Sequence, residues 1–528
     1  MKRHSFISRL ASLAVVCGLT LAFASCANDD LAQNGKTSTD DKGLTAFSTG
    51  DPATRTTMEA DGKFYWEAGD KIWVKDDSGN WKQSSNSPTG KTASFKFLMP
   101  GKYTANSSYE VYYPGKNGSQ DRVTISANQT QTEPNTTAHF GASGDCGIAK
   151  ATRNATSHEF EFALDHKAAY LVFKPYTSND VLKYCYLTKI EVTSDNDITD
   201  TYTLDPTAET NTGALTGTGS GKQIILTTKG DYYGSTYPNG FPLTNTSASL
   251  TTNGAYMVIK PGTHTLRIRY WVKDVATNII GTITKIIPSH TFAKNEYVNM
   301  EADLQVKNYD GDHYYMWDAQ QNYWAGHEWN SANPWQPTHK TQSFNPNYAR
   351  SNTDPRYYND SYPGWGISNP AIHSCKDLPN ANEMSWYAMY GDPRWDADEL
   401  WTLMGHLYKG GMWFKKKSVL QAEHHYDTEK DAYGTIDLRI IYNSYVNNSS
   451  SIGSGLPSAA DAGKYFYLPA SGSYEYGALN HVGDMGWYWS SGANSGTNAE
   501  ALYLNFGRSY INVNSYGRFA GFRVGVFE

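Results

Sequence analysis

The sequence is poor in charge and in cysteine, and it holds no apolar run long enough to cross a membrane. Charged residues make up 18% of the 528 positions, which excludes a disordered polyampholyte and a coiled coil. The 45 basic and 52 acidic side chains give a net charge of -7, so the chain lacks the basic field that attracts nucleic acid. We therefore expect neither a nucleic-acid partner nor a transmembrane helix.

Cysteine is scarce, at five residues, and none stands in a CxxC pair. Cys17 and Cys26 belong to the N-terminal segment, which leaves Cys146, Cys185 and Cys375. An odd number of widely spaced cysteines does not match a zinc site or a redox pair. We expect no metal and no cofactor, and the disulfide state of Cys146 and Cys185 stays open.

Histidine offers little else for a metal site. His424 and His425 are adjacent, so their side chains diverge, and the segment that begins at His327 lacks the second histidine of a zinc-protease motif. At both places, the histidines are better explained as surface residues than as metal ligands.

Acidic residues are the remaining candidates for a catalytic role. Asp392, Asp396 and Glu399 could form an acid and base pair on paper, but nothing in the sequence sets the distance between them. We expect no catalytic residues and no enzymatic activity. A cell-envelope enzyme that acts on polysaccharide through such carboxylates is the alternative.

Aromatic residues and glycine are abundant instead. The chain has 39 Tyr, 15 Trp and 46 Gly, and its length predicts two or more domains. Most of the tryptophans lie after residue 300. Because Tyr and Trp combine a large apolar area with a polar tip, this excess indicates a stacked core or a recognition surface.

The first residues have the order of a secretion signal. Basic Lys2, Arg3 and Arg9 precede an apolar run over 10–24, and Cys26 follows small residues. The stretch FASCANDD resembles the lipoprotein box of bacteria, which implies cleavage after residue 25 and lipid on Cys26.

The acidic stretch after the cysteine resembles the export signals of lipoproteins in the Bacteroides group. That resemblance implies a lipid-anchored protein of the cell outer membrane that is exposed on the cell surface. Residues 26–50 are polar and poor in large apolar side chains, and we expect a flexible tether there.

Residues 51–306 divide into short β-strands. Phe160 and Phe162 alternate with glutamates, as half-buried strands require. The stretches FYWEAGDKIWV, FALDHKAAYLVFKP and FAKNEYVNMEADL resemble the fimbrillin family of Bacteroides-type bacteria. The resemblance implies tandem transthyretin-like β-sandwiches over 51–165 and 166–306, with a seam near residue 165.

Fimbrillins of this type assemble by strand exchange after proteolysis beyond an arginine, and Arg55 matches that position loosely. An ordinary exposed arginine in a polar entry segment is the better explanation of Arg55, and the protease site is the alternative. More than 200 residues follow the last fimbrillin-like strand, whereas a donor strand lies near the C-terminus. We therefore expect a tip subunit or a free-standing lipoprotein, with a structural fimbrial subunit as the alternative and other fimbrial subunits as candidate partners.

Residues 307–528 have a different composition, with helices and strands. Helical spacing is predicted for 380–392 and again after Asp396, where Gly410 and Gly411 would end the helix.

The segments KYFYLPASG, GWYWSSG and GFRV resemble α+β C-type-lectin-like domains related to the formylglycine-generating enzyme. Cys375 is the only cysteine after residue 306 and no WND strand is present, so neither cysteine oxidation nor a calcium-bridged sugar site is expected.

The C-terminal strands carry a candidate ligand-binding face. In ALYLNF and INVN, apolar residues alternate with Tyr and Asn, so that one side is core and the other is polar. The intervening loops are rich in Tyr, Ser, Gly and Arg, the composition of antibody-type binding surfaces. Trp489, Phe522 and Val524 are assigned to packing, and Arg523 to internal polar contacts. The predicted ligand-binding residues are Trp487, Asn494, Glu500, Tyr503, Arg508, Tyr510, Asn512, Asn514, Tyr516, Arg518 and Phe519.

This composition also resembles the variable proteins of diversity-generating retroelements. In such proteins the binding positions are rewritten in the gene while the framework is kept. The overall prediction is a mainly β surface adhesin that binds a protein or glycan ligand on a host or neighbouring cell.

Overall fold

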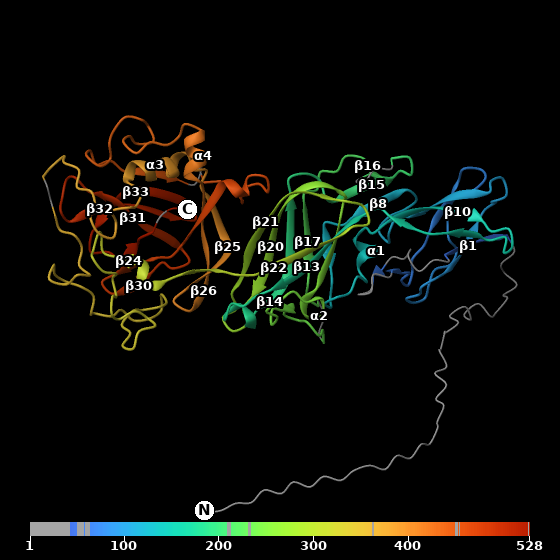
Figure 1. Cartoon of the computed structure of the whole chain (residues 1–528), viewed down its shortest axis with the longest axis horizontal. Helices are drawn as coiled ribbons and strands as arrows, with labels where there is room; N and C mark the ends of the chain where they lie inside the picture. The colour runs from blue at the N-terminus through green and yellow to red at the C-terminus, as the bar shows by residue number, and fades with distance from the viewer. Residues whose placement is uncertain are drawn as a thin grey trace, which may run out of the picture. The chain divides into compact units, whose positions relative to one another are not determined.

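The computed structural model describes residues 43–49, 57–58, 64–208, 213–230, 234–361, 364–448, 452–453, 455–525 and 527 (Figure 1). The chain divides into residues 1–44 and residues 45–528, and only 43 and 44 of the first unit are described. The predicted signal peptide, Cys26 and Arg55 lie outside the described residues. Residues 45–528 are mainly β, as predicted. No described helix is long and apolar enough to cross a membrane.

An eight-stranded sheet forms the first core, in the order β5-β4-β7-β10-β11-β1-β6, with β12 paired to β10. Phe160 and Phe162 are buried and Glu161 is exposed, so the predicted alternation is confirmed. Residues 44–49, which were predicted to be tether, form β1 because Phe47 stacks on Phe160 with ring centroids 4.8 Å apart. The strands are β1 (Leu44–Thr49), β4 (Trp73–Lys75), β5 (Trp81–Gln83), β6 (Lys96–Pro100), β7 (Ser108–Tyr113), β10 (Gly147–Arg153), β11 (Phe160–Phe162) and β12 (Asp165–His166), and a separate hairpin joins β2 (Thr57–Met58) to β3 (Phe64–Tyr65).

The second core lies between two three-stranded sheets and part of a ten-stranded sheet. Strands that precede residue 165 take part in it, since β8 pairs with β15 and β9 pairs with β17. Phe140 of α1 (Phe140–Ser143) stacks on Tyr170, with ring centroids 5.0 Å apart. The two sandwiches are therefore interleaved in sequence near the predicted seam. The two small sheets are β19-β13-β22 and β16-β15-β8, from β8 (Arg122–Ile125), β13 (Ala169–Tyr176), β15 (Asp200–Leu204), β16 (Leu215–Thr216), β19 (Ala255–Ile259) and β22 (Tyr297–Asp303).

The ten-stranded sheet continues from the second core into the C-terminal domain. Its order is β28-β26-β25-β21-β20-β14-β17-β9, with β18 on β14 and β23 on β25. The continuation is a parallel pairing of β21 with β25, at Thr282 and Glu399. The strands are β9 (Asn128–Thr130), β14 (Tyr186–Ser194), β17 (Gln223–Thr227), β18 (Phe241–Pro242), β20 (Gly262–Lys273), β21 (Ile280–Phe292), β23 (Lys307–Tyr309), β25 (Arg394–Leu403), β26 (His406–Lys415) and β28 (Tyr465–Pro469).

Strands β25 and β26 form a hairpin, which corrects the helix predicted after Asp396. The hairpin closes at Met404 and Gly405, whose φ angles are 49° and 77°. Two successive positive φ angles suit the tight turn that joins twisted antiparallel strands. Apolar residues on both sides of this turn are buried, and together they imitate helical spacing. They are Leu400, Leu403, Met404 and Leu407.

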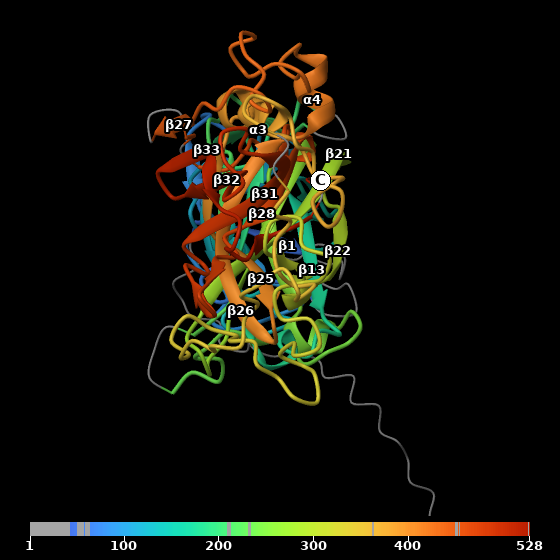
Figure 2. The ribbon, with the colours of Figure 1, turned by 90° about the vertical axis from the view of Figure 1, so that its left-hand side faces the viewer.

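The C-terminal domain is built on a six-stranded sheet in the order β24-β34-β31-β32-β33-β27. Helix α3 (Ala381–Tyr390) lies against this sheet, as Figures 1 and 2 show, and it confirms the helix predicted for 380–392. Asn380 and Glu383 close its N-terminus as a capping box. The remaining elements are β24 (Tyr314–Tyr315), β27 (Tyr445–Asn448), β29 (Ser473–Glu475), β30 (Ala478–Asn480), β31 (Met485–Ala493), β32 (Glu500–Gly507), β33 (Tyr510–Gly517), β34 (Phe522–Arg523), α2 (Leu250–Asn253), α4 (Lys417–Ala422), η2 (Leu182–Tyr184), η3 (Gly311–His313) and η5 (Ala462–Lys464).

Candidate ligand-binding face

The register of β31, β32 and β33 places the predicted aromatic and amide residues on one side of the sheet. Residue pairs that lie opposite each other across the strands share a face. Trp487 is aligned with Asn505 and then with Asn512, and Tyr503 with Asn514. The opposite side packs against α3 through residues that are almost fully buried, namely Leu504, Phe506, Ile511 and Val513. The predicted core side is confirmed, whereas the Tyr/Asn side is polar only in part, because Tyr503 and Asn505 are buried and Tyr503 belongs to a second apolar cluster.

Aromatic rings follow one another across this side of the sheet. Trp487 stacks on Tyr503 with centroids 5.4 Å apart and meets the edge of Tyr516 at 5.9 Å. Tyr516 lies 6.2 Å from Phe519, which stacks on Tyr476 at 5.0 Å. We call these five residues the aromatic face. Tyr476 is 59% exposed, Tyr503 is buried, and the other three are half-buried.

Polar groups on this side have unused hydrogen-bonding capacity. The indole nitrogen of Trp487 and the side-chain oxygen of Asn512 have no partner among the described residues. The Tyr516 hydroxyl differs from these two groups, because burial, followed by the charge of Glu475 and a hydrogen bond with it, raises the pKa of Tyr516. Buried polar groups without a partner are costly unless water or a ligand satisfies them.

Arg518 does not belong to the exposed surface, although it was predicted to bind ligand. Its side chain is fully buried and lies over the ring of Trp317, 4.6 Å from the ring centroid. The guanidinium donates to the backbone oxygens of Asn359 at 2.7 Å and Glu500 at 2.9 Å. Burial lowers its pKa to about 10, which still leaves it charged. Arg518 therefore holds loops together and is not free to contact a ligand.

Asn494 and Glu500 are also used inside the domain. The amide of Asn494 donates to the carboxylate of Glu500 at 3.1 Å, and the hydroxyl of Ser515 donates to the same carboxylate at 2.6 Å. Asn494 is buried and Glu500 is half-buried. These contacts assign both residues to loop structure.

Arg508 and Tyr510 lie at the other end of the strands. Arg508 is exposed at the β32–β33 turn and lines a cavity of about 520 Å³ together with Asp396 and Asp398. The hydroxyl of Tyr510 donates to the sulfur of Met485 at 3.2 Å, and Tyr510 is half-buried. Arg508 is therefore not part of the aromatic face.

An exposed apolar rim beside this face was missed by the sequence prediction. Tyr442 is 44% exposed, and its hydroxyl donates to the side chain of Asn514 at 2.6 Å. Ile441 is 56% exposed, and the backbone of Ile440 accepts a hydrogen bond from Ser495. These residues stand in irregular segments without periodicity, so only the fold brings them beside the strands. We call Ile440, Ile441 and Tyr442 the apolar rim.

The residues assigned to packing are confirmed in part. Trp489 and Phe522 are buried and stack on each other with centroids 4.3 Å apart. The guanidinium of Arg523 donates to the backbone oxygen of Asp310 at 3.1 Å, as expected for internal polar contacts. Val524 is half-buried beside this cluster.

The histidines that were considered as metal ligands form ordinary contacts. His425 stacks on Tyr390 with centroids 4.2 Å apart, and His327 shares a hydrogen bond with the backbone of Asn333. Within the described ranges, the one group with metal-binding geometry is Asp310, Asp312 and His313, all exposed. This group includes none of the histidines that the sequence analysis considered as metal ligands.

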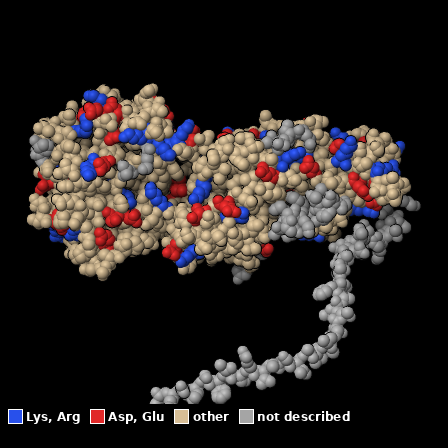
Figure 3. Space-filling model, viewed as in Figure 1, with Lys and Arg blue, Asp and Glu red and all other residues tan. Residues whose placement is uncertain are grey.

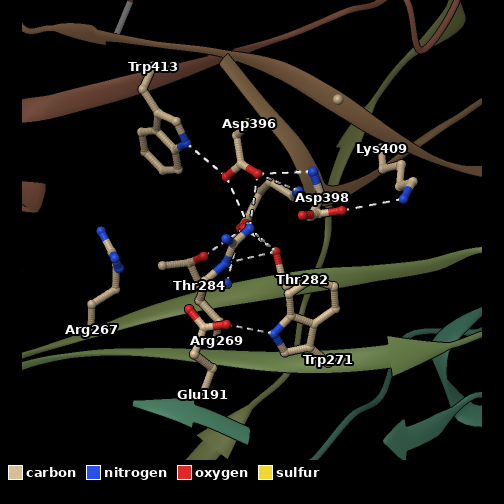
Figure 4. A network of polar contacts seen from close by, with 12 residues as sticks. Glu191, Arg267, Arg269, Trp271, Thr282, Thr284, Asp396, Asp398, Lys409 and Trp413 are labelled. Carbon is tan, nitrogen blue, oxygen red and sulfur yellow. Dashed lines mark hydrogen bonds and ion pairs between the residues drawn. The ribbon is translucent and has the colours of Figure 1, made fainter. Parts of the chain in front are cut away.

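A buried polar network joins β20 and β21 to β25 (Figure 4). Arg269 donates to both carboxylate oxygens of Asp396, at 3.0 and 3.2 Å, and to the hydroxyl of Thr282. The indole N–H of Trp413 donates to Asp396 as well. Glu399 accepts from the hydroxyls of Thr282 and Thr284. Asp396 is thus held in a buried ion pair with Arg269.

Charges of both signs are interspersed on the surface that Figure 3 presents, and large parts of it carry neither sign. No basic region gathers on this view of the C-terminal domain. This distribution agrees with the low and nearly balanced charge of the sequence.

No family model matches the sequence, and no curated protein matches it. Among solved structures, a Bacteroides ovatus protein assigned to cell adhesion is 12% identical over 49% of this chain and 92% of its own, with a TM-score of 0.30. A fimbrial protein from the same species is 9% identical over 91% of this chain and 98% of its own, with a TM-score of 0.24. The fimbrial anchor protein Mfa2 of Porphyromonas gingivalis is 9% identical over 46% of this chain and 82% of its own, with a TM-score of 0.20. At such TM-scores the likeness carries no weight for function.

Proposed function

We propose that the chain is a cell-surface adhesin whose C-terminal domain binds a macromolecular ligand through the aromatic face. The observation that carries this proposal is the row of neighbouring rings from Trp487 to Tyr476 on the sheet side opposite α3. Large, rigid aromatic side chains supply contact area at low entropic cost and dominate binding energy at interfaces.

A protein on a host or neighbouring cell is the ligand class that this surface fits best. The apolar rim adds exposed aliphatic groups beside the rings, and burial of Ile441 against a partner removes apolar area from water. Glycans use aromatic rings as well, but aliphatic side chains contribute little to sugar contacts. A glycan is therefore the alternative outcome of the binding test.

The test is binding of the lipid-free chain, beginning at residue 27, to arrays of cell-surface proteins and glycans. In a triple variant, Tyr476→Ala, Tyr516→Ala and Phe519→Ala remove the accessible rings. We expect this variant to lose at least about tenfold in affinity, since interface aromatics are each worth about 1 to 2 kcal/mol or more. Thermal unfolding shows whether the variant keeps its fold.

Tyr184→Ala is the matched control, because Tyr184 is 72% exposed on the second sandwich, far along the chain from the aromatic face. It should leave binding unchanged. Undiminished binding by a folded triple variant would contradict the proposal. Cleavage of a glycan that a single carboxylate substitution abolishes would favour the enzyme alternative instead.

The proposed anchor is lipid on Cys26 at the outer face of the outer membrane. The motif in the sequence supports it, together with the basic and apolar residues that precede the cysteine. Cells that express the chain should incorporate labelled palmitate into it, and Cys26→Ser should abolish the label. Protease added to intact cells should remove the described domains. Recovery of the chain as a repeated subunit of purified filaments would show a structural fimbrial role instead.

A further inference from the structure

A second cavity lies beneath the junction between the sandwich strands and the C-terminal domain. Its volume is about 530 Å³, which is the size of a site for one small molecule. Residues of β21 and β23 line one part of it, and residues of β25, β26, β28, β31 and β34 line most of the rest, together with Asp310 and His313. None of the five residues of the aromatic face lines this cavity. It is therefore independent of the proposed adhesive surface.

Aromatic rings form much of the cavity wall. Trp413 lies beside Tyr467 with centroids 5.1 Å apart, and Trp401 meets the edge of Tyr309 at 5.9 Å. The hydroxyl oxygen of Tyr467 is buried without a partner among the described residues, and burial raises the pKa of this phenol. The cavity thus offers flat aromatic surfaces, which can receive the apolar face of a sugar ring.

Three cationic side chains line the same cavity without a carboxylate partner. They are Lys285, Lys307 and Arg523, and none forms an ion pair with a carboxylate among the described residues. Arg523 is 7% exposed and lies over Tyr309, 5.2 Å from the ring centroid. The ammonium of Lys307 lies over the same ring at 5.0 Å, and burial, with the charge of Arg523, lowers its pKa. Arg523 and Lys307 thus hold two positive charges near the ring of Tyr309, and together these charges attract an anion.

We propose that this cavity binds a carboxylate-bearing sugar, with the carboxylate held by Arg523 and Lys307 and the ring against the tryptophan and tyrosine side chains. A guanidinium and an ammonium form strong charge-assisted hydrogen bonds to a carboxylate. Aromatic walls select the apolar face of a sugar ring over a bare inorganic anion. The site is separate from the macromolecular ligand of the proposed adhesin.

Besides Asp310, Glu399 is the acidic group on the cavity wall. Its carboxyl accepts hydrogen bonds from Thr284, and burial, followed by the charge of Asp396, raises its pKa to about 7. Below that pH the wall loses the negative charge of Glu399, so less repulsion opposes the attraction of an anion to the three cations. The other charged or titratable groups around Glu399 and on the cavity wall are Asp396 on β25, Arg269 on β20, Lys285 on β21, Lys307 and Tyr309 on β23, Asp310 and His313 just after β23, Tyr467 on β28, Tyr488 on β31 and Arg523 on β34.

The test is calorimetric titration of the lipid-free chain with D-galacturonate and N-acetylneuraminate, with D-galactose as the neutral match. The acidic sugars should bind at least about tenfold more tightly than galactose, because one charge-assisted hydrogen bond to the sugar carboxylate contributes about that much affinity. Lys307→Met should weaken the acidic sugars by a similar factor. Lys150→Met is the matched control, because Lys150 is an exposed lysine on β10, and it should change nothing.

The pH profile gives a second readout. Binding should be stronger near pH 6 than near pH 8, because Glu399 is protonated at the lower pH. Glu399→Gln should keep the strong binding at both pH values.

Three outcomes would overturn the proposal. In the first, neither acidic sugar binds, or galactose binds as well as they do. In the second, a folded Lys307→Met variant binds both acidic sugars undiminished. In the third, the triple variant of the aromatic face abolishes acidic-sugar binding, which would locate that site on the face and not in the cavity.

Discussion

Arg269 on β20 donates to both carboxylate oxygens of Asp396 on β25, at 3.0 and 3.2 Å, in a junction from which water is nearly excluded. The side chains are 7% and 2% exposed. The alternation of β20 predicts an exposed arginine at position 269, since Leu266, Ile268 and Tyr270 fill the core. The C-terminal domain covers that outer side, so the two charges can exist only as a pair.

Removal of one partner of this pair should destabilise the protein strongly. Asp396→Asn leaves Arg269 buried and uncompensated, and we expect a loss of about 3 to 5 kcal/mol in unfolding free energy. Urea denaturation followed by tryptophan fluorescence measures it. Asp484→Asn is the control, because its 3.1 Å pair with Lys340 is more than half exposed and should contribute less than about 1 kcal/mol. Equal effects of the two substitutions would show that the junction pair is unimportant.

Two arginines that the sequence assigned to the same binding surface should behave differently. Arg518→Ala removes a buried cation that donates to loop backbone oxygens, and it should cost about 3 kcal/mol or more. Arg508→Ala changes an exposed side chain and should stay within about 0.5 kcal/mol. Thermal unfolding of both variants provides the comparison. A large loss in Arg508→Ala, with none in Arg518→Ala, would reverse the assignment.

The three described cysteines should be unreactive in the folded protein. Cys146, Cys185 and Cys375 are free and buried. Burial raises the pKa of each thiol, to about 12 for Cys185, so the reactive thiolate is scarce at neutral pH. Iodoacetamide followed by mass spectrometry should label none of them until denaturant is added. Labelling of a native sample at any of the three sites would contradict the burial.

Stability should fall as the pH rises through the range in which Glu399 ionises. The folded chain keeps this proton up to a pH of about 7, whereas an exposed glutamate releases it near 4.5. The native state therefore binds more protons in between, and ionisation costs the fold up to about 3 kcal/mol between pH 5 and 8. Urea denaturation of wild type and Glu399→Gln at both pH values measures this term.

The comparison with Glu399→Gln isolates one group. Burial lowers the pKa of His139 to about 4, so His139 contributes stability that is lost as the pH falls below its ordinary range. That term has the opposite sign and is present in both proteins, so it cancels in the difference. If wild type and variant lose the same stability between pH 5 and 8, Glu399 is not the group responsible.

Strand alternation could be predicted from the sequence, whereas helix and hairpin could not always be told apart. The burial of Phe160 and Phe162, and the division of β32 and β33 into two sides, follow from a period of two residues. The hairpin at Met404 was mistaken for a helix, because buried residues on both sides of a two-residue turn reproduce a spacing of three and four.

The candidate face was only partly predictable. Trp487, Tyr516 and Phe519 were found because recognition surfaces share their composition, but composition cannot tell an exposed arginine from a buried one. Arg518 is buried because loops distant in sequence, at Asn359 and Ser361, fold over it. The apolar rim escaped notice for the opposite reason, since Ile441 has no periodic pattern to mark it.

By itself, the sequence determined the mainly β class, the end of the chain that carries the aromatic surface, and, in strands such as β11, β32 and β33, the side that faces a core. These properties depend on composition and on neighbours along the chain. Only the tertiary structure decided that Arg269 meets Asp396, that Arg518 is internal, and that a cationic, aromatic cavity lies at the junction. Each depends on contacts between segments more than 100 residues apart, and the free energy of burying a charge is set by what the fold places beside it.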